Sequence, residues 1–354
     1  MHSKKSFQTP SDAVKAVSIL EGVARDLRRE TPGALNLMAR EGRAEDLAHC
    51  YALYGSVWFP DVEPCSRVLP EMWRTLLSNG RMQLFLVEDR AKPLGSRIAS
   101  FSATVFVTDE FCREAQSTVS PCLGLHIARH YLSHELPVLN REQVAQANAR
   151  NGLNLLMCFE GGGHDGLSRD QMLAVREKQS EAFHLAHRGY RLKEFLADLI
   201  GGEALQWMIS AGARLRGDYS AYFQKHNVPI PEASQRPWLV GLTKEEAFAN
   251  PGSHLASFFV YTPPRFHFNR SEQMLLGRAL MGETCEELAA SLLISYWTVK
   301  KRWHAIYERV EDIDSELLPP VNNGLHAASR GAERRRRLLA YLRQHLEELR
   351  PLAR

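Results

Sequence analysis

The sequence is poor in cysteine and has no close cysteine pair. Six cysteines occur in 354 residues, and no two of them have C-x-x-C spacing. A structural zinc site or a disulfide framework needs closely spaced cysteines, so neither is predicted. Scattered reduced thiols are typical of cytosolic proteins, and we expect a cytoplasmic protein. The six are Cys50, Cys65, Cys112, Cys122, Cys158 and Cys285.

Long hydrophobic runs and an excess of one charge are also absent. No run of 18 apolar residues occurs, so no membrane-spanning helix is predicted. The first residues, MHSKKSFQTPSDAVKAV, contain lysines but no apolar core of signal-peptide length. Lys and Arg number 44 against 41 Asp and Glu, which gives a net charge of +3. No basic field therefore surrounds the whole protein, and any nucleic-acid contact must be local.

Three short helices are predicted over residues 268–310, near the C-terminal end. Asn269 and Thr284 are each followed by a glutamate three residues on, which is the spacing of a capping box. Ser295 is a suitable N-cap for the third helix. The apolar stripe of that helix consists of Val299, Trp303, Ile306 and Val310.

Two short helices joined by a tight turn form a helix-turn-helix, whose second helix is free to enter a DNA groove. With the apolar stripe turned into the bundle, cations and hydrogen-bond donors remain on the other side, where they can meet phosphates and base edges. The alternative is a helical bundle that packs on protein. The candidate DNA-binding residues are Tyr296, Trp297, Thr298, Lys300, Lys301, Arg302 and His304.

Residues 268–310 also resemble the LuxR-type helix-turn-helix. The resemblance implies that the positions of Lys300, Lys301 and His304 face the major groove. Trp297 departs from it, because small or acidic residues are usual there, and Trp303 is larger than usual in the core. The matching residues are Glu272, Ala279, Gly282, Glu287, Leu288, Ala289, Ile294, Ser295, Thr298, Val299, Lys300, Ile306 and Tyr307.

The chain from residue 34 to residue 198 alternates between strand and helix patterns, which predicts an α/β layered domain. Strands are predicted at 34–40, 82–89, 97–111 and 151–159, helices at 43–59, 66–80, 139–150 and 168–189, and residues 190–199 fit either. Beyond these, we expect a helix at 203–215, a proline-rich connector at 226–237, a strand and short helix at 238–252, and an apolar strand at 254–266.

This element order resembles the GNAT N-acetyltransferase fold. The segment AHRGYRLKEF is similar to the one that follows the family's last helix. That family cradles the acetyl-CoA pyrophosphate on a Q/R-x-x-G-x-G/A loop before its third main helix. The corresponding stretch here, TVSPCLGLHIAR, has the single glycine Gly124 and lacks that spacing. The resemblance thus implies the fold with its cofactor site lost or changed.

Three other patterns carry alternatives. His126, His130 and His134 would share one face of a helix as metal ligands, or they are ordinary surface or buried histidines. The sequence GGGHDG, residues 161–166, could cradle a phosphate, although a flexible turn is favoured. His164 with Asp165 or Glu160 could form an acid–base pair, but no nucleophile motif accompanies it. Cys158 lies in an apolar strand and is interpreted as a core residue.

Both ends of the chain contain amphipathic segments. Residues 11–29 predict a helix that packs on its own domain or on a second subunit. Residues 330–350 predict a final helix with four consecutive arginines, 334–337. These arginines are interpreted as a phosphate clamp or part of a dimer helix, or as side chains whose stems cover the bundle.

Taken together, the patterns predict an α+β protein. Its predicted parts are an N-terminal helix (1–33), a GNAT-like α/β sensor domain (34–237), a strand-rich connector (238–267), a LuxR-type helix-turn-helix domain (268–310) and a loop with a basic C-terminal helix (311–354). The function predicted is a DNA-binding transcriptional regulator without enzymatic activity, metal or cofactor. Its expected partners are double-stranded DNA, a small-molecule or protein effector and a second copy of the chain. The alternatives are an acyltransferase-like enzyme with a regulatory helix-turn-helix, and a protein-interaction module.

Overall fold

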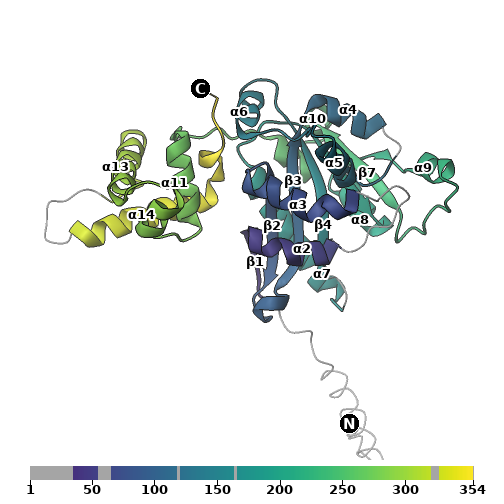
Figure 1. Ribbon diagram of the computed structural model, residues 1–354, viewed down its shortest axis with the longest axis horizontal. Coiled ribbons are helices and arrows are strands. Elements are labelled where there is room, and N and C mark those ends of the chain that lie inside the picture. Colours follow the sequence, from purple (N-terminus) through teal and green to yellow (C-terminus); the bar gives the residue numbers. More distant parts are fainter. Residues whose placement is uncertain (1–34, 55–64, 118–119, 163–165, 320–326, 354) are drawn as a thin grey trace, which may run out of the picture.

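The computed structural model describes residues 35–54, 65–117, 120–162, 166–319 and 327–353. They form one seven-stranded sheet covered by helices, followed by a group of C-terminal helices that lies beside the sheet (Figure 1). The helix predicted over residues 11–29 lies outside the described residues. No helix among the described residues is long and apolar enough to cross a membrane.

The sheet has the strand order β1-β2-β3-β4-β5-β7-β6. All its neighbouring strands are antiparallel except β4 and β5, the one parallel pair among the described strands. A parallel pair needs a long crossover, which helix α7 (Arg169–His187) supplies. The strands are β1 (Leu37–Glu41), β2 (Met82–Asp89), β3 (Ile98–Val107), β4 (Leu153–Gly162), β5 (Leu192–Ile200), β6 (Arg214–Gly217) and β7 (Pro237–Thr243).

Two hydrophobic cores lie on the two faces of the sheet. The first surrounds Trp73, whose ring centroid is 4.6 Å from that of Phe159. The second surrounds Phe183, whose ring centroid is 5.7 Å from that of Phe195 and 4.9 Å from that of Phe258. On the first face lie α2 (Leu47–Tyr54), α3 (Cys65–Ser78), α4 (Asp109–Ser117), α5 (Leu123–Leu132) and α9 (Ser220–Lys225). On the second lie α6 (Arg141–Ala149), α7, α8 (Gly202–Ser210), α10 (Lys244–Ala249) and the 3-10 helix η3 (Leu255–Phe259). Two further 3-10 turns are η1 (Ala44–Asp46) and η2 (Leu94–Ser96).

The observed elements confirm the predicted mixed sheet with helices, but several segments differ. Residues 254–266 were expected to form a strand and instead contain η3, because four of its five residues are buried against α7 and β5 without strand alternation. Helices α4 and α5 were not predicted, and the strand expected at 97–111 ends at Val107. The helix expected at 203–215 ends at Ser210 and is followed by β6. Residues 190–199, which fitted a strand or a helix, form β5.

The C-terminal helices begin at the predicted caps. Asn269, Thr284 and Ser295 each accept hydrogen bonds from backbone N–H groups in the first turn of the helix that follows. These helices are α11 (Arg270–Leu280), α12 (Cys285–Ser291) and α13 (Tyr296–Ile313), and the chain ends with α14 (Ala327–Gln344) and the 3-10 helix η4 (Leu346–Leu349). The domain boundaries and the LuxR-type assignment stay predictions.

The arginine run of α14 packs on the bundle. Arg334 forms an ion pair of 2.7 Å with Glu311 and lies over the Tyr307 ring. Arg335 lies over the Trp303 ring, with Cζ 4.9 Å from the centroid. These contacts support the interpretation that arginine stems cover the bundle, and they leave Arg334 and Arg335 poorly placed for a phosphate clamp.

The segment after α14 joins the helical group to the sheet. Arg350 donates hydrogen bonds to the carbonyls of Leu185 and Arg188, at the end of α7, and lies over the Tyr190 ring. Glu347 is buried and forms an ion pair of 3.1 Å with Arg188. The two parts of the chain are therefore tied at the C-terminal end of α7.

The sequence placed Trp303 in the helical core, and the structure confirms this. Trp303 is 4% exposed and stacks on Tyr307 at 5.6 Å. We expect Trp303→Ala to lower the free energy of unfolding of the C-terminal helices by roughly 3–5 kcal/mol, because it leaves a large cavity. Urea unfolding followed by the helical circular dichroism signal measures this loss.

Trp297, six residues earlier on the same helix, provides a matched control. It is 80% exposed, so Trp297→Ala should change the free energy of unfolding by less than ~0.5 kcal/mol. Equal unfolding curves for the two variants would contradict the assigned core position of Trp303.

Candidate functional site

Strands β4 and β5 form backbone hydrogen bonds with each other along only part of their length. The paired positions run from Leu153 opposite Leu192 to Met157 opposite Ala197. Both strands continue beyond this point, and each stays paired with its other neighbour, β3 or β7. The facing edges of β4 and β5 therefore separate inside an otherwise continuous sheet, and the gap opens a passage between its two faces.

The first turn of α5 lies across this gap. The backbone N–H of Leu123 donates to the Asp198 carboxylate on β5, and the Tyr219 hydroxyl donates to the same side chain. Gly124 allows the close approach, because a Cβ there would lie 2.2 Å from the Phe159 ring and 2.9 Å from the Cys158 carbonyl oxygen. Burial raises the pKa of Asp198 to about 6, and its two hydrogen bonds oppose the shift.

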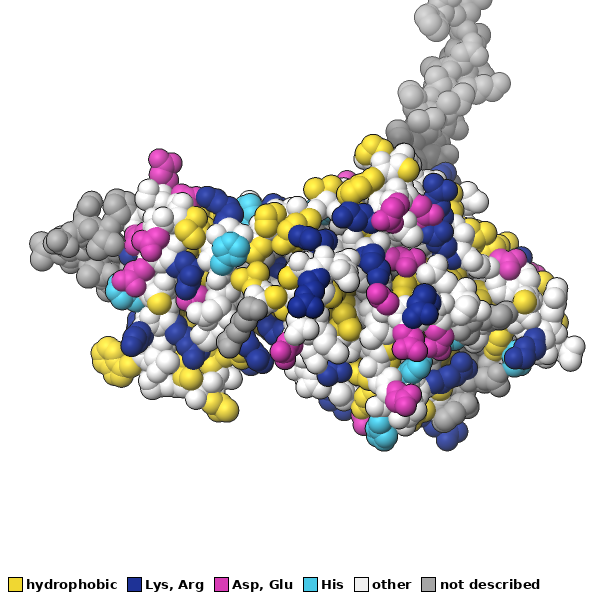
Figure 2. All heavy atoms as spheres, turned by 90° about the horizontal axis from the view of Figure 1, so that it is seen from above, with side chains coloured by type: hydrophobic (Ala, Val, Ile, Leu, Met, Phe, Trp, Pro, Cys, Tyr) yellow, Lys and Arg dark blue, Asp and Glu magenta, His cyan; other side chains and the backbone are white. Residues whose placement is uncertain are grey.

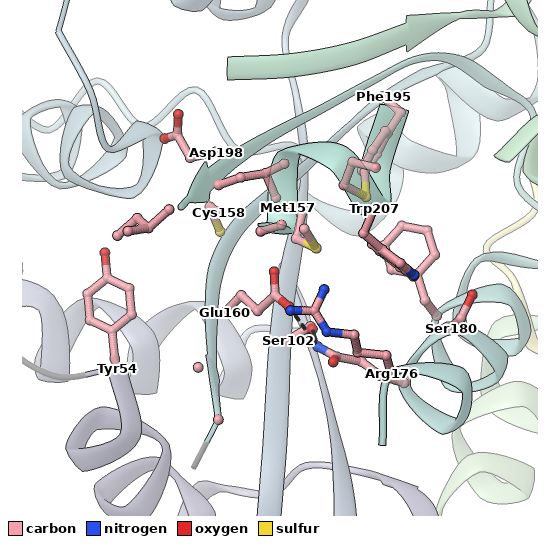
Figure 3. Close-up of a pocket in the computed structure, with 18 of the residues that line it drawn as sticks. Tyr54, Ser102, Met157, Cys158, Glu160, Arg176, Ser180, Phe195, Asp198 and Trp207 are labelled. Atoms are coloured by element: carbon pink, nitrogen blue, oxygen red, sulfur yellow. Dashed lines mark hydrogen bonds between the residues drawn. The ribbon is translucent and has the colours of Figure 1, made fainter. Parts of the chain in front are cut away.

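A cavity of about 330 Å³ occupies the gap. Its lining comes from both hydrophobic cores, so it reaches both faces of the sheet. Figure 3 shows Tyr54 on one side of β4, and Arg176, Trp207 and Ser180 on the other. Most of the lining is apolar, and it includes Leu53, Met157, Phe183, Phe195, Leu199, Met208, Leu255 and Phe258.

On the α7 side, the principal polar group is Glu160 of β4. Its exposed surface faces the cavity, and its carboxylate accepts a hydrogen bond of 3.3 Å from the Gln179 side chain. Gln179 is in turn bonded to the buried hydroxyl of Ser102. Burial raises the pKa of Glu160, while the positive charge of Arg176 and the Gln179 hydrogen bond lower it. This carboxylate is thus positioned to accept a proton from a molecule in the cavity.

On the opposite side, Tyr54 lies near Asp198, Cys122 and Cys158. Burial raises the Tyr54 pKa well above its usual value, and the negative charge that neighbouring groups such as Asp198 can carry raises it further. The tyrosine therefore keeps its proton and can act as a proton donor. Burial likewise raises the pKa of the Cys122 and Cys158 thiols, which makes both poor nucleophiles at neutral pH.

The histidines that the sequence offered as metal ligands do not come together in one site. His126 is buried and bonded to the Ser120 carbonyl, His130 pairs with Glu114, and His134 lies beyond the end of α5 with a positive φ. The three histidines therefore do not form the shared face that a metal would need. Cys158 is a buried residue of β4, as predicted.

The stretch TVSPCLGLHIAR, which the sequence matched to the family's pyrophosphate loop, was misplaced. It leads into α5, on the first face of the sheet. The segment that precedes the crossover helix α7 is instead the glycine-rich stretch after β4, of which residues 163–165 lie outside the described ranges. The wrong match arose because helices α4, α5 and α6 lie between β3 and β4 in the chain.

Sequence reasoning singled out Glu160 but missed Tyr54, Asp198, Arg176 and Trp207. Asp198 left a signal, since an aspartate interrupts the apolar run of the β5 segment FLADLI. Tyr54, Arg176 and Trp207 left no such signal in the sequence, because each fits the ordinary pattern of an amphipathic helix.

The seven predicted DNA-binding residues lie together on the N-terminal half of α13. Trp297 is 80% exposed. The Lys300 ammonium lies 5.2 Å from the centroid of the Tyr296 ring, and His304 is 3.4 Å from a Glu308 oxygen. Tyr296, Trp297, Lys300, Lys301 and His304 are exposed, and Thr298 and Arg302 are half-buried. On the face drawn in Figure 2, basic and acidic side chains are interspersed.

No protein-family model and no curated protein matches the sequence. Solved structures do show similarity. The C-terminal condensation domain of Ebony in complex with β-alanyl-dopamine is 14% identical, with a TM-score of 0.35 over 59% of this chain and 100% of that chain. A mutant of the spermidine N-acetyltransferase SpeG from Vibrio cholerae is 11% identical, with a TM-score of 0.34 over 61% of this chain and 98% of that chain. Arabidopsis thaliana NAA60 in complex with acetyl-CoA is 8% identical, with a TM-score of 0.35 over 59% of this chain and 99% of that chain.

These comparisons support the GNAT-like fold expected for the N-terminal part. They correct the predicted function, because the similar structures include a spermidine N-acetyltransferase and a protein in complex with acetyl-CoA. The predictions of a transcriptional regulator and of no enzymatic activity are therefore wrong. At such low identities and TM-scores the likeness says nothing of substrate. The contact of the α13 residues with DNA, the effector and the homodimer stay predictions.

The raised pKa of Asp198 has a consequence for stability. Its folded value of about 6 lies above its ordinary value of 3.8, so the folded state binds the proton more tightly than the unfolded state. The stabilisation is present below about pH 4 and is lost as the pH rises to 6. We expect Asp198 to contribute a loss of roughly 1–3 kcal/mol across this window.

The variant Asp198→Asn isolates this contribution, because it keeps an acceptor for Leu123 and Tyr219 but does not titrate. Urea unfolding of both proteins from pH 4 to pH 7 should show a shallower fall in stability for the variant. Parallel curves over this range would show that the Asp198 pKa is not raised.

Proposed function

We propose that the N-terminal part of the chain is an acyltransferase that moves an acyl group from a thioester to an amine. One observation carries the proposal: the cavity at the separated ends of β4 and β5, with a carboxylate, Glu160, on one side and a protonated phenol, Tyr54, on the other. Acyl transfer to an amine needs both a proton acceptor and a proton donor.

The gap suits the carrier of an acyl thioester. Past Met157 and Ala197 the facing backbone edges of the two strands do not pair with each other. Backbone N–H and C=O groups on such edges favour partners that supply the missing hydrogen bonds. The pantetheine arm of a thioester carrier is extended and contains amide groups, so it can lie along the edges while its acyl end enters the apolar cavity.

Glu160 is the group that we assign as the base. An amine reaches the cavity mainly as the ammonium ion, and the ionised carboxylate takes one proton from it. The amine nitrogen then attacks the thioester carbonyl carbon, so that a C–N bond forms and the C–S bond breaks. The new amide nitrogen gives up its second proton to solvent, and Glu160 later releases the proton that it took. The raised pKa of Glu160 makes it a better proton acceptor than a carboxylate with an ordinary pKa.

Tyr54 is the group that we assign as the acid. The sulfur leaves as a thiolate and needs a proton, which the Tyr54 hydroxyl can donate before recovering one from solvent. Direct transfer is favoured over an acyl–cysteine intermediate, because burial keeps the Cys122 and Cys158 thiols protonated.

The proposal is tested by the release of thiol from short-chain acyl-CoA thioesters in the presence of a panel of primary amines. We expect Glu160→Gln to lower kcat/KM about 10²–10⁴-fold, the usual contribution of a general base, with donor affinity retained. In the unmodified protein, kcat/KM should rise as the pH rises through the raised Glu160 pKa, because the base acts when ionised. This rise should be absent from the variant.

Glu177→Gln supplies the control, since Glu177 is an exposed carboxylate on α7 that does not line the cavity. Its kcat/KM should equal that of the unmodified protein. Failure of the unmodified protein to bind any acyl thioester by calorimetry would refute the proposal.

A further inference from the structure

The α7 side of the cavity contains a cation that the proposed reaction does not use. Arg176 projects into the cavity and lies over the Trp207 ring, with Cζ 5.7 Å from the centroid. Within the described part of the chain, its guanidinium makes no hydrogen bond and has no carboxylate oxygen within 4.0 Å. A guanidinium presents several donors in one plane, and it binds carboxylates and phosphates through two parallel hydrogen bonds. Arg176 is thus available to a ligand anion.

Glu160 adds the opposite charge to the same space. Figure 3 shows its carboxylate beside the Arg176 guanidinium, with Met157 and Trp207 around them. The two charges interact, but they do not form an ion pair within 4.0 Å. A ligand with an anion alone would be repelled by Glu160, and one with a cation alone by Arg176. A ligand that has both charges close together satisfies both side chains.

The surroundings of this charge pair are apolar. Phe183, Phe195, Met208 and Phe258 form the adjacent wall, and each is buried. A polar extension of the ligand would lose its hydration there without gaining partners. An aliphatic or aromatic group would instead gain from leaving water.

We infer that the acyl acceptor is an α-amino acid with an apolar side chain, whose carboxylate binds Arg176 and whose ammonium group binds Glu160. The inference rests on the proposed function, since the ammonium group held by Glu160 is the one that loses its proton and attacks the thioester. The product is then an N-acyl amino acid and a free thiol.

Calorimetric titration with three related probes tests the two charges separately. L-Leucine has both groups, L-leucinamide lacks the carboxylate, and (S)-2-hydroxy-4-methylpentanoate lacks the ammonium. We expect the unmodified protein to bind leucine about 10- to 100-fold more tightly than either analogue, as is usual for a charge-assisted hydrogen bond. Arg176→Gln should abolish the preference for leucine over leucinamide. Glu160→Gln should abolish its preference over the hydroxy acid.

Lys178→Gln is the matched control, because it removes a positive charge from the same helix at a residue that pairs with Glu181 and does not line the cavity. It should leave all three affinities unchanged. Equal binding of leucine and leucinamide by the unmodified protein would overturn the inference, whatever the variants do.

Titration with butyryl-CoA separates this inference from the proposed function. If the thioester binds and leucine is not preferred over its analogues, the amino acid inference fails and the acyltransferase proposal stands. If the leucine pattern appears and no thioester binds, the acyltransferase proposal fails, and with it the role of the amino acid as acceptor.

Discussion

The site depends on the interruption of pairing between β4 and β5. A parallel pair in the middle of a sheet normally continues to the end of both strands, because unpaired backbone groups in the interior are costly. Here α5 spans the gap with its first turn, where Leu123 donates to Asp198 and Gly124 approaches β4 so closely that a Cβ would lie 2.9 Å from the Cys158 carbonyl oxygen. The helix thereby stabilises the separated strands on one face and leaves the other face open to a cavity.

The gap also explains why the cavity has two chemically different walls. Side chains of a strand alternate between faces, so a passage through the sheet is lined by residues from both. Cys158 and Asp198 face the first core with Tyr54, and Met157 and Glu160 face α7. A proton donor and a proton acceptor can then approach one reacting carbonyl from opposite sides, without the direct pairing that would neutralise them.

The sequence predicted the features that depend on local pattern. Asn269 and Thr284 mark helix starts through capping spacing, and Trp303 is assigned to the core through helical periodicity. The interrupted pairing left no comparable signal, because it depends on which strands become neighbours and where their register ends. Arg176 was overlooked for a similar reason, since its environment is set by β4, whose residues are distant in sequence. The wrong strand at residues 254–266 shows the limit of periodicity, because a short buried run fits either element.

Helix α7 connects the cavity to the C-terminal helices. Its middle contributes Arg176, Ser180 and Phe183 to the cavity, and its last turn holds Arg350 through backbone carbonyls. Phe258 of η3, which leads from the sheet to α11, packs on Phe183 as part of the same wall. Side chains in a packed interior do not move independently. A ligand that displaces Phe183 or Phe258 therefore acts on α7, whose last turn is bonded to Arg350, and on η3, which continues along the chain to α11.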